Sequence, residues 1–253
     1  MIQFSPEQRF IVTGASSGIG EGVALLLNEL GATVIGIGRN IERLDGMKAK
    51  ACHPECMFLE RKDLTEDIQN LPAYVKALKD KYGKFSGMAY CAGATRIESV
   101  RMFDYDAAKQ LFDINYYAPM FMTKGVIDKR NNVGRGCSLV YVASLDADVC
   151  SRGAALYSGS KAALAASVKS IAREVSAAGI RMNSVLPAMI KTPMTLNPQM
   201  SDVFGRREAD ESAMYPFGWG EVKDLATFIV YLLSDCAKFI SGQRYVYDSG
   251  ENR

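Results

Sequence analysis

The sequence predicts an α/β fold in which a doubly wound, mainly parallel sheet of seven strands is covered by helices on both faces. Short apolar runs alternate with longer helix-period stretches along the 253 residues, which is typical of strand–helix–strand units and a parallel sheet. The strand-like runs are almost continuously apolar, as expected where both faces of a strand are buried. A glycine-rich turn, TGASSGIG at 13–20, joins the first of these runs to the first helix-period stretch.

The expected elements follow one another in regular order. Strands are expected at 9–14, 33–38, 56–61, 86–93, 138–144, 181–187 and 244–248. Helices are expected from Gly18–Ile19 to Gly31 and near 40–50, 71–82, 104–130, 157–177 and 222–234. The rhythm breaks at 188–220, which is rich in Met, Pro, Gly and aromatic residues. We therefore expect residues 1–253 to form a single domain with 188–220 as a binding loop or lid, because long irregular segments in compact domains are usually functional.

Composition and charge exclude several classes of protein. Hydrophobic residues make up 48% and charged residues 23%, with a net charge of +2, so nothing favours binding to nucleic acid or to an anionic membrane. No apolar run is long enough to span a bilayer. The first residues lack the basic and apolar regions of a signal peptide, so we expect an untargeted cytoplasmic protein.

Cysteine and histidine usage narrows the chemistry further. The six cysteines are scattered along the chain, which favours free thiols in a reducing compartment. A zinc site at CHPEC (52–56) is not expected, because His53 is the only histidine and zinc needs four well-spaced ligands. We expect no metal, and with a single histidine in the chain we do not expect a Ser-His-Asp hydrolase either.

The glycine turn has the chemistry of a phosphate-binding site. Gly14 can adopt a tight turn, Gly18 lets a backbone approach a pyrophosphate, and Gly20 lets the helix pack closely on the strand. The phosphates would lie at the helix N-terminus, where free N–H groups favour anions.

Tyr157 and Lys161 lie one helical turn apart in LYSGSKAALA (156–165), so their side chains share a helix face. A tyrosine has an ordinary pKa of about 10, and a fixed cation nearby favours the phenolate and lowers that pKa. The alternative interpretation is an amphipathic helix with a surface lysine.

Together these motifs make the sequence resemble the single-domain branch of the short-chain dehydrogenases/reductases, a family with a Rossmann-type fold. The turn has the spacing G-x-x-x-G-x-G, and eight segments occur in the family's order. They are TGASSGIG (13–20), DLT (63–65), CAG (91–93), DINYYAP (113–119), VYVAS (140–144), YSGSK (157–161), PAMIKTPM (187–194) and SGQRYVYDSG (241–250).

The resemblance implies an oxidoreductase that interconverts a small-molecule ketone or aldehyde with its alcohol by hydride transfer. Tyr157 would be the general acid in reduction and the base in oxidation, and Lys161 would lower its pKa and bind the nicotinamide ribose. Ser144 would orient the substrate oxygen. Asn115 would hold a water that links Lys161 to solvent. These roles agree with the chemistry of the reaction: when the carbonyl carbon gains or loses a hydride, the oxygen bonded to it must gain or lose a proton.

The resemblance also implies a nicotinamide cofactor, and NADP(H) is expected rather than NAD(H). NAD-binding members carry Asp where Gly38 lies here, and Arg39 follows. Without an acidic side chain at position 38, the Arg39 guanidinium favours binding of a ribose 2′-phosphate, and Arg43 would contribute to binding the same phosphate. The alternative is that Arg39 simply ends a surface strand. The other implied cofactor-binding residues are Gly14, Ser16, Ser17, Gly18, Ile19, Asp63, Leu64, Ala92, Gly93, Tyr157, Lys161, Pro187, Ile190 and Thr192.

Some positions depart from the family pattern. Cys91 lies where the family usually has an asparagine that braces the central sheet, and Ala188 lies where glycine is usual. A buried structural thiol is the favoured interpretation of Cys91 over a redox role.

The substrate side is less determined by the sequence. Met and aromatic side chains of the insert could form an adaptable apolar wall or a satellite core. They are Met189, Met194, Leu196, Met200, Phe204, Met214, Tyr215, Phe217 and Trp219. Four charged residues could bind a polar substrate or lie at a solvated rim: Arg96, Asp146, Asp148 and Arg152.

Two other functions compete with a carbonyl reductase. Enoyl reductases of the family separate the tyrosine and lysine by more residues than this chain does. A non-catalytic NADP(H)-sensing or scaffold protein on the same fold usually loses one of the two. The resemblance further implies a homodimer or homotetramer, formed through the helices at 104–130 and 156–177.

Overall fold

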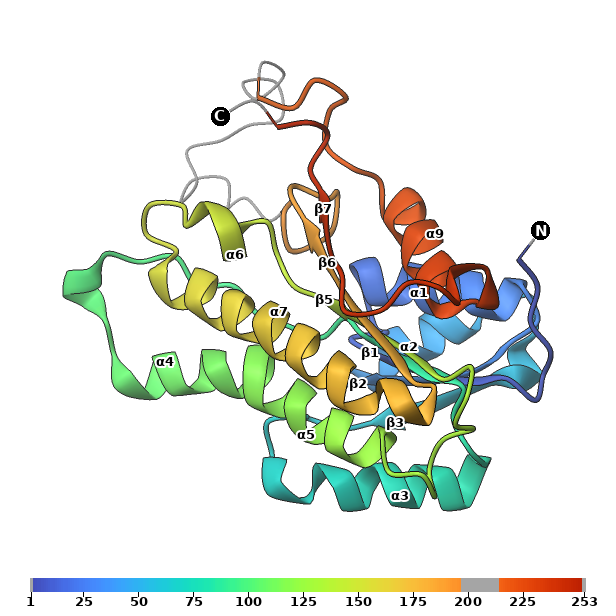
Figure 1. The fold of residues 1–253 in the computed structure, drawn as a ribbon. Coiled ribbons are helices and arrows are strands. Elements are labelled where there is room, and N and C mark those ends of the chain that lie inside the picture. The colour runs from blue at the N-terminus through green and yellow to red at the C-terminus, as the bar shows by residue number, and fades with distance from the viewer. Residues whose placement is uncertain (1, 197–213, 252–253) are drawn as a thin grey trace.

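A single parallel sheet organises the computed structural model, which describes residues 2–196 and 214–251 (Figure 1). Within these residues the strands are β1 (Arg9–Thr13), β2 (Thr33–Gly38), β3 (Met57–Arg61), β4 (Gly87–Tyr90), β5 (Ser138–Val142), β6 (Arg181–Pro187) and β7 (Arg244–Tyr247). They pair in the order β3-β2-β1-β4-β5-β6-β7, and every pair is parallel. The predicted fold class is confirmed. The continuous apolar runs account for it, since β2, β4, β5 and β6 are buried along their whole length.

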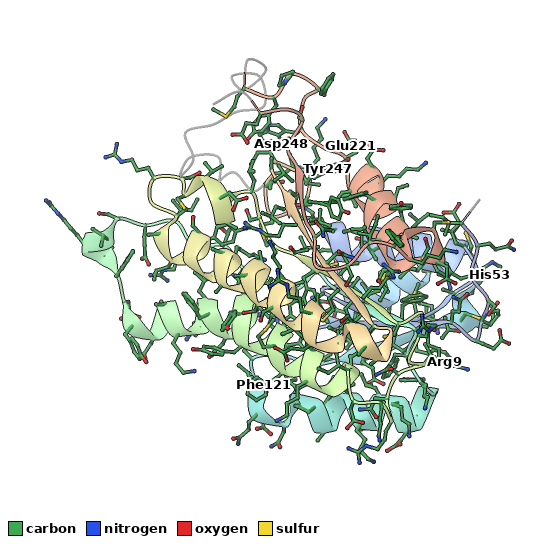
Figure 2. All side chains as sticks on the ribbon, in the orientation of Figure 1. Arg9, His53, Phe121, Glu221, Tyr247 and Asp248 are labelled. Atoms are coloured by element: carbon green, nitrogen blue, oxygen red, sulfur yellow. The ribbon has the colours of Figure 1, made fainter. Side chains whose placement is uncertain are left out.

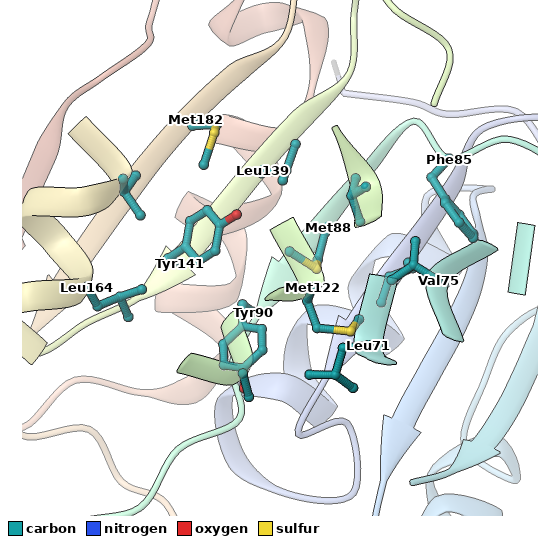
Figure 3. Close-up of a cluster of buried hydrophobic side chains, with 14 of the residues drawn as sticks. Leu71, Val75, Phe85, Met88, Tyr90, Met122, Leu139, Tyr141, Leu164 and Met182 are labelled. Carbon is teal, nitrogen blue, oxygen red and sulfur yellow. The ribbon is translucent and has the colours of Figure 1, made fainter. Parts of the chain in front are cut away.

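Helices cover both faces of the sheet (Figure 1). One face is covered by α1 (Gly18–Glu29), α2 (Ile41–Lys48) and α9 (Val222–Leu233). The other face is covered by α3 (Leu71–Tyr82), α5 (Ala118–Val126) and α7 (Ala155–Val175). Each face has its own cluster of buried apolar side chains, and Figure 3 shows part of the cluster beneath α3, α5 and α7.

The direction of winding reverses at β1. This strand pairs with β2 on one side and β4 on the other. The chain leaves β1 toward β2 but leaves β4 toward β5, so the two connections diverge from neighbouring strand ends, the arrangement that opens a crevice for a ligand. The Thr13 hydroxyl accepts hydrogen bonds from the Cys91 and Ala92 N–H groups, both at 3.1 Å. One side-chain oxygen therefore holds the two strand ends together.

The segment predicted as one helix over 104–130 differs from that prediction. It consists of α4 (Tyr105–Phe112), a π-helical turn over Asp113–Tyr117, and α5, which ends at Val126. Asn131 and Asn132 donate their side-chain amides to the carbonyls of Gly125 and Val126, at 2.8 Å each. These bonds satisfy carbonyls that a helix C-terminus leaves unpaired and so account for the earlier end.

Two further features concern the segments around the sheet. A short helix, α6 (Asp146–Val149), follows β5 and was not expected from the sequence. Of the predicted loop at 188–220, residues 197–213 lie outside the described residues. Across 2–196 and 214–251, no helix combines the length and the apolar character needed to traverse a lipid bilayer.

Candidate active site

A cavity of about 840 Å³ runs along the carboxyl ends of the strands. All predicted site residues except Asn115 line it. The order of the strands determines where each residue lies along the cavity: Arg39 follows β2, Ser144 follows β5, and the ends of β1 and β4 lie between them. The predicted residues in its wall are Gly14, Ser16, Ser17, Gly18, Ile19, Arg39, Asp63, Leu64, Ala92, Gly93, Ser144, Tyr157, Lys161, Pro187, Ile190 and Thr192.

The glycine turn forms part of the wall of this cavity, and its glycines let the backbone pass close to neighbouring residues. Gly14 and Gly18 adopt positive φ angles of 67° and 57°, which favour glycine. A Cβ on Gly14 would lie 2.9 Å from the Ala92 nitrogen, and one on Gly18 would lie 3.3 Å from Thr192 Cβ. Ser17, at the N-cap of α1, makes no side-chain cap bond. The first-turn N–H groups therefore remain available to an anion, which fits a dinucleotide pyrophosphate.

Gly20 serves packing, as its place in the turn predicts. A Cβ there would collide with the Gly14 carbonyl oxygen, so Gly20→Ala should lower the free energy of unfolding by on the order of 2–4 kcal/mol. Gly46 is the matched control, because it lies in α2 with no atom within 4 Å of an added Cβ. Gly46→Ala should instead stabilise by about 0.5–1 kcal/mol. Urea denaturation of both variants measures the difference, and equal changes would contradict the packing role.

The Arg39 end of the cavity carries positive charge. Arg39 is 80% exposed, with its guanidinium 3.8 Å from the Asp63 carboxylate. Burial opposes ionisation of Asp63, but hydrogen bonds from the Thr65 N–H and hydroxyl, at 2.9 and 2.7 Å, and the Arg39 charge hold the pKa of Asp63 below its usual value. A Cβ on Gly38 would lie 3.2 Å from Ser16 Oγ, so a side chain at this position would require Ser16 to move.

Lys62 also lines this end of the cavity and was missed from the sequence. Its N–H donates to the Gly38 carbonyl at 3.0 Å, which brings the ends of β2 and β3 together. The sequence could have identified Lys62, because this residue directly precedes the DLT segment, and the carboxyl ends of neighbouring parallel strands lie at the same edge of the sheet.

Lys161 is buried at the end of the cavity next to β5. Its side chain is 5% exposed, and Nζ donates to the Val142 carbonyl at 2.9 Å. Burial lowers the pKa of Lys161 to about 8, and Cys91 acts in the opposite direction. The ammonium therefore lies in a poorly solvated position just beyond β5.

Tyr157 differs from expectation in the direction of its pKa shift. Burial raises the pKa of Tyr157 to about 12, Asp146 also raises it, and a hydrogen bond with Ser144 lowers it. The sequence predicted a lowering by Lys161. In the structure the Lys161 ammonium donates to the Val142 carbonyl, and loss of hydration of the phenolate is the largest influence on the Tyr157 pKa. Tyr157 thus keeps its proton through neutral pH.

Asn115 lies behind the cavity wall, on the π turn. Its Nδ2 donates to the Ala94 carbonyl at 2.9 Å and to Ser160 Oγ at 3.0 Å, and its Oδ1 accepts from the Ala94 N–H at 3.0 Å. A Cβ on Gly93 would lie 3.1 Å from this Oδ1 and 3.2 Å from Lys161 Nζ. Asn115 and Lys161 thus flank the same glycine, and the water between them and solvent stays a prediction.

Cys91 has the surroundings of a structural thiol. Burial raises the pKa of Cys91 to about 12, although Lys161 acts in the opposite direction. The sulfur therefore stays protonated and poorly nucleophilic at neutral pH.

The cavity wall also includes Thr95, Arg96, Gln110 and Met194, on the side where the sequence predicts the substrate. Arg96 binds Glu98 through two hydrogen bonds, at 2.5 and 2.6 Å. The other three charged candidates are placed elsewhere. Asp146 accepts from Ser151, Asp148 pairs with Arg244, and Arg152 is exposed.

The Met and aromatic residues of the insert do not form one wall. Met189, Tyr215, Phe217 and Trp219 line a second cavity of about 480 Å³, on the side of the molecule where Glu221, Tyr247 and Asp248 are labelled in Figure 2. Met200 and Phe204 lie outside the described residues.

A doubly wound sheet with a glycine turn at its switch point defines a dinucleotide-binding class of protein. A family model described as enoyl-(acyl carrier protein) reductase matches residues 14–252. The chain belongs to the short-chain dehydrogenase/reductase family, a family of oxidoreductases.

Individual relatives agree with this assignment over most of the chain. A 3-oxoacyl-[acyl-carrier-protein] reductase of Rickettsia conorii is 31% identical, with 95% of each chain covered. A 2-keto-3-deoxy-L-fuconate dehydrogenase of Xanthomonas campestris is 29% identical over 96% of this chain and 79% of its own. A short-chain type dehydrogenase/reductase of Mycobacterium ulcerans superposes with a TM-score of 0.86 and 29% identity, over 98% of this chain and 90% of its own.

Proposed function

We propose that this protein is an NADP(H)-dependent oxidoreductase that interconverts a ketone or aldehyde with the corresponding alcohol. One observation carries the proposal. A single cavity has Ser144, Tyr157 and Lys161 at one end, Arg39 at the other and the glycine turn between them, so a cofactor and a small substrate can meet in it.

The cavity residues divide between holding the cofactor and moving a proton. The glycine turn would hold the pyrophosphate, Asp63 and Leu64 the adenosine, Arg39 the 2′-phosphate, and Ile190 and Thr192 the carboxamide. When bound, the nicotinamide supplies or accepts the hydride.

Tyr157 delivers the proton that carbonyl reduction requires. Its raised pKa suits this role, because the phenol is protonated at neutral pH. Ser144 lies near enough to Tyr157 to lower its pKa, and it orients the substrate oxygen. Lys161 binds the ribose and opposes build-up of negative charge when the phenol loses its proton.

Two observations favour this proposal over its rivals. Tyr157 and Lys161 both line the cavity, which supports an enzyme over a sensor or scaffold. They lie four residues apart on α7, the spacing expected for carbonyl reduction rather than enoyl reduction. The relatives' printed names include a 3-oxoacyl reductase and a dehydrogenase of a keto sugar acid, so the substrate has to be found by experiment.

A substrate panel tests the function. Sugars, hydroxy acids, steroids and acyl thioesters are incubated with NADPH, NADP⁺, NADH or NAD⁺ while the absorbance of the reduced nicotinamide is followed. We expect turnover with the NADP(H) pair for at least one class. Dinucleotide binding without any turnover would favour the sensor or scaffold, and failure to bind any dinucleotide would overturn the proposal.

Arg39 should determine the choice of cofactor. Arg39→Asp should raise the Kd of NADPH by at least about tenfold, the equivalent of one charge-assisted hydrogen bond, and leave the Kd of NADH within about twofold. Arg130→Asp is the matched control, because Arg130 is exposed and does not line the cavity. Fluorescence titration measures both constants, and equal weakening of the two dinucleotides would refute the 2′-phosphate role.

We also propose a homodimer or homotetramer. Large apolar side chains are exposed on and just before α4, among them Met102 and Tyr105, and Tyr117 is exposed on the π turn. These side chains suit burial against a second copy, and light scattering in solution measures the mass.

A further inference from the structure

The π turn that carries Asn115 leaves one backbone carbonyl, that of Ile114, in need of a partner from outside the helix. We propose that Tyr90 is a positioning residue that supplies this partner and so fixes the register of the turn and the Asn115 amide. The inference rests on the proposed function for its catalytic consequence, although the structural part can be tested by itself.

The need for a partner follows from the hydrogen bonds of the turn. The Ala118 N–H donates to the Asp113 carbonyl, five residues earlier. Continuing the same pattern, the carbonyl of Ile114 would accept from residue 119, which is proline and has no N–H. A buried carbonyl without a donor costs about 1–3 kcal/mol, so this register needs another donor.

Tyr90 provides that donor from the end of β4. Its hydroxyl donates to the Ile114 carbonyl at 3.1 Å, and its ring is fully buried. The ring stacks on Tyr141 with centroids 6.4 Å apart, in the cluster shown in Figure 3. Burial raises the pKa of Tyr90, so the hydroxyl keeps the proton that it donates.

The alternative register needs no tyrosine. In an ordinary α-helix the Ala118 N–H would donate to the Ile114 carbonyl, four residues earlier. That register rotates the preceding residues about the helix axis, which would turn the Asn115 amide away from Ala94 and Ser160. The Tyr90 hydroxyl satisfies the carbonyl that the π register would otherwise leave unpaired, and so favours that register.

The register of the π turn affects the positions of the proposed catalytic residues through hydrogen bonds and close packing. Asn115 holds Ala94 through two hydrogen bonds, directly after Gly93, whose Cα faces Lys161 Nζ. Asn115 also donates to Ser160 Oγ, which in turn donates to the Tyr157 carbonyl at 2.7 Å. π turns of this kind occur frequently at functional sites.

The test compares Tyr90→Phe with Tyr141→Phe. Each change removes one buried hydroxyl and keeps the ring, but the Tyr141 hydroxyl bonds to Thr123 instead of to the π turn. We expect Tyr90→Phe to lower kcat by about 10- to 100-fold, as misplaced catalytic groups do, with KM changed less than threefold. Tyr141→Phe should lower the melting temperature and leave kcat unchanged. In an Asn115→Ala background Tyr90→Phe should have no further effect on kcat, because the two changes act through one group.

Hydrogen exchange separates this inference from the proposed function. Tyr90→Phe should speed exchange of the Ala94 N–H, whereas Tyr141→Phe should not. If the protein proves to reduce no carbonyl compound, this measurement still decides the register. Unchanged exchange of Ala94 would overturn the inference. Altered exchange with an unchanged kcat in an active enzyme would also overturn it, since Tyr90 would then serve stability alone.

Discussion

Tyr157→Phe should lower turnover by about 10²- to 10⁴-fold, the usual contribution of a positioned general acid, and leave the Kd of NADPH within about twofold. The ring still fills its place beside Ser144, but no proton can reach the substrate oxygen. Stopped-flow reduction of the best substrate in the panel measures turnover, and titration measures the Kd. Tyr105→Phe is the control, because Tyr105 is 81% exposed. Activity that survives in Tyr157→Phe would remove the acid–base assignment.

The pH dependence of the unmodified enzyme has a definite sign. Since the pKa of Tyr157 is raised to about 12, the acid form persists and reduction should not decline between pH 6 and about 7.5 for want of the phenol proton. Alcohol oxidation needs the deprotonated form and should rise with pH over the same range. Initial rates in both directions test this, and a reduction rate that falls tenfold per pH unit there would contradict a protonated Tyr157.

Lys161→Met should abolish most activity and yet stabilise the protein. The pKa of Lys161 is lowered to about 8 in the folded chain, against about 10.4 when unfolded. The unfolded chain therefore binds more protons between these values, so the destabilisation caused by the Lys161 charge is fully present below pH 8 and fades as pH rises from about 8 to about 10.4. At pH 7 the buried ammonium costs about 3 kcal/mol.

Methionine removes this cost but leaves the Val142 carbonyl without its donor, so the net gain at pH 7 should be about 1–2 kcal/mol. The difference in stability between Lys161→Met and the unmodified chain should then shrink as pH rises from 8 to 10. Lys169→Met, at an exposed position of the same helix, should show no such trend. Urea denaturation across this range provides the measurement, and a pH-independent difference would contradict the buried charge.

The parts of the fold that depend on local sequence could be predicted. Apolar runs located each strand within a few residues, and β2 and β6 have the predicted bounds. Gly14, Gly18 and Gly20 behave as their spacing in the turn indicates, because positive φ and close approach are local requirements that glycine alone meets easily.

The parts of the fold and of the site that depend on contacts between distant residues could not be predicted from the sequence. The π turn needs Tyr90, which lies 24 residues before Ile114, and the sequence offers only Pro119 as a hint. The direction of the Tyr157 pKa shift depends on burial, which the Tyr–Lys spacing does not reveal. The apolar residues of the insert were treated as one group, but the fold divides them between two cavities.

The order of strands in the sheet separates two kinds of specificity along the chain. The wall at the end proposed for the adenosine, from Gly14 to Thr65, comes from the first three strand–helix units, whereas the wall at the end proposed for the reaction comes from residue 91 onward. Under the proposed function, mutations in the first portion of the gene would alter the choice of dinucleotide while the pocket proposed for the carbonyl compound stays intact. The same division would let recombination near residue 66 join the cofactor preference of one ancestor to the substrate range of another.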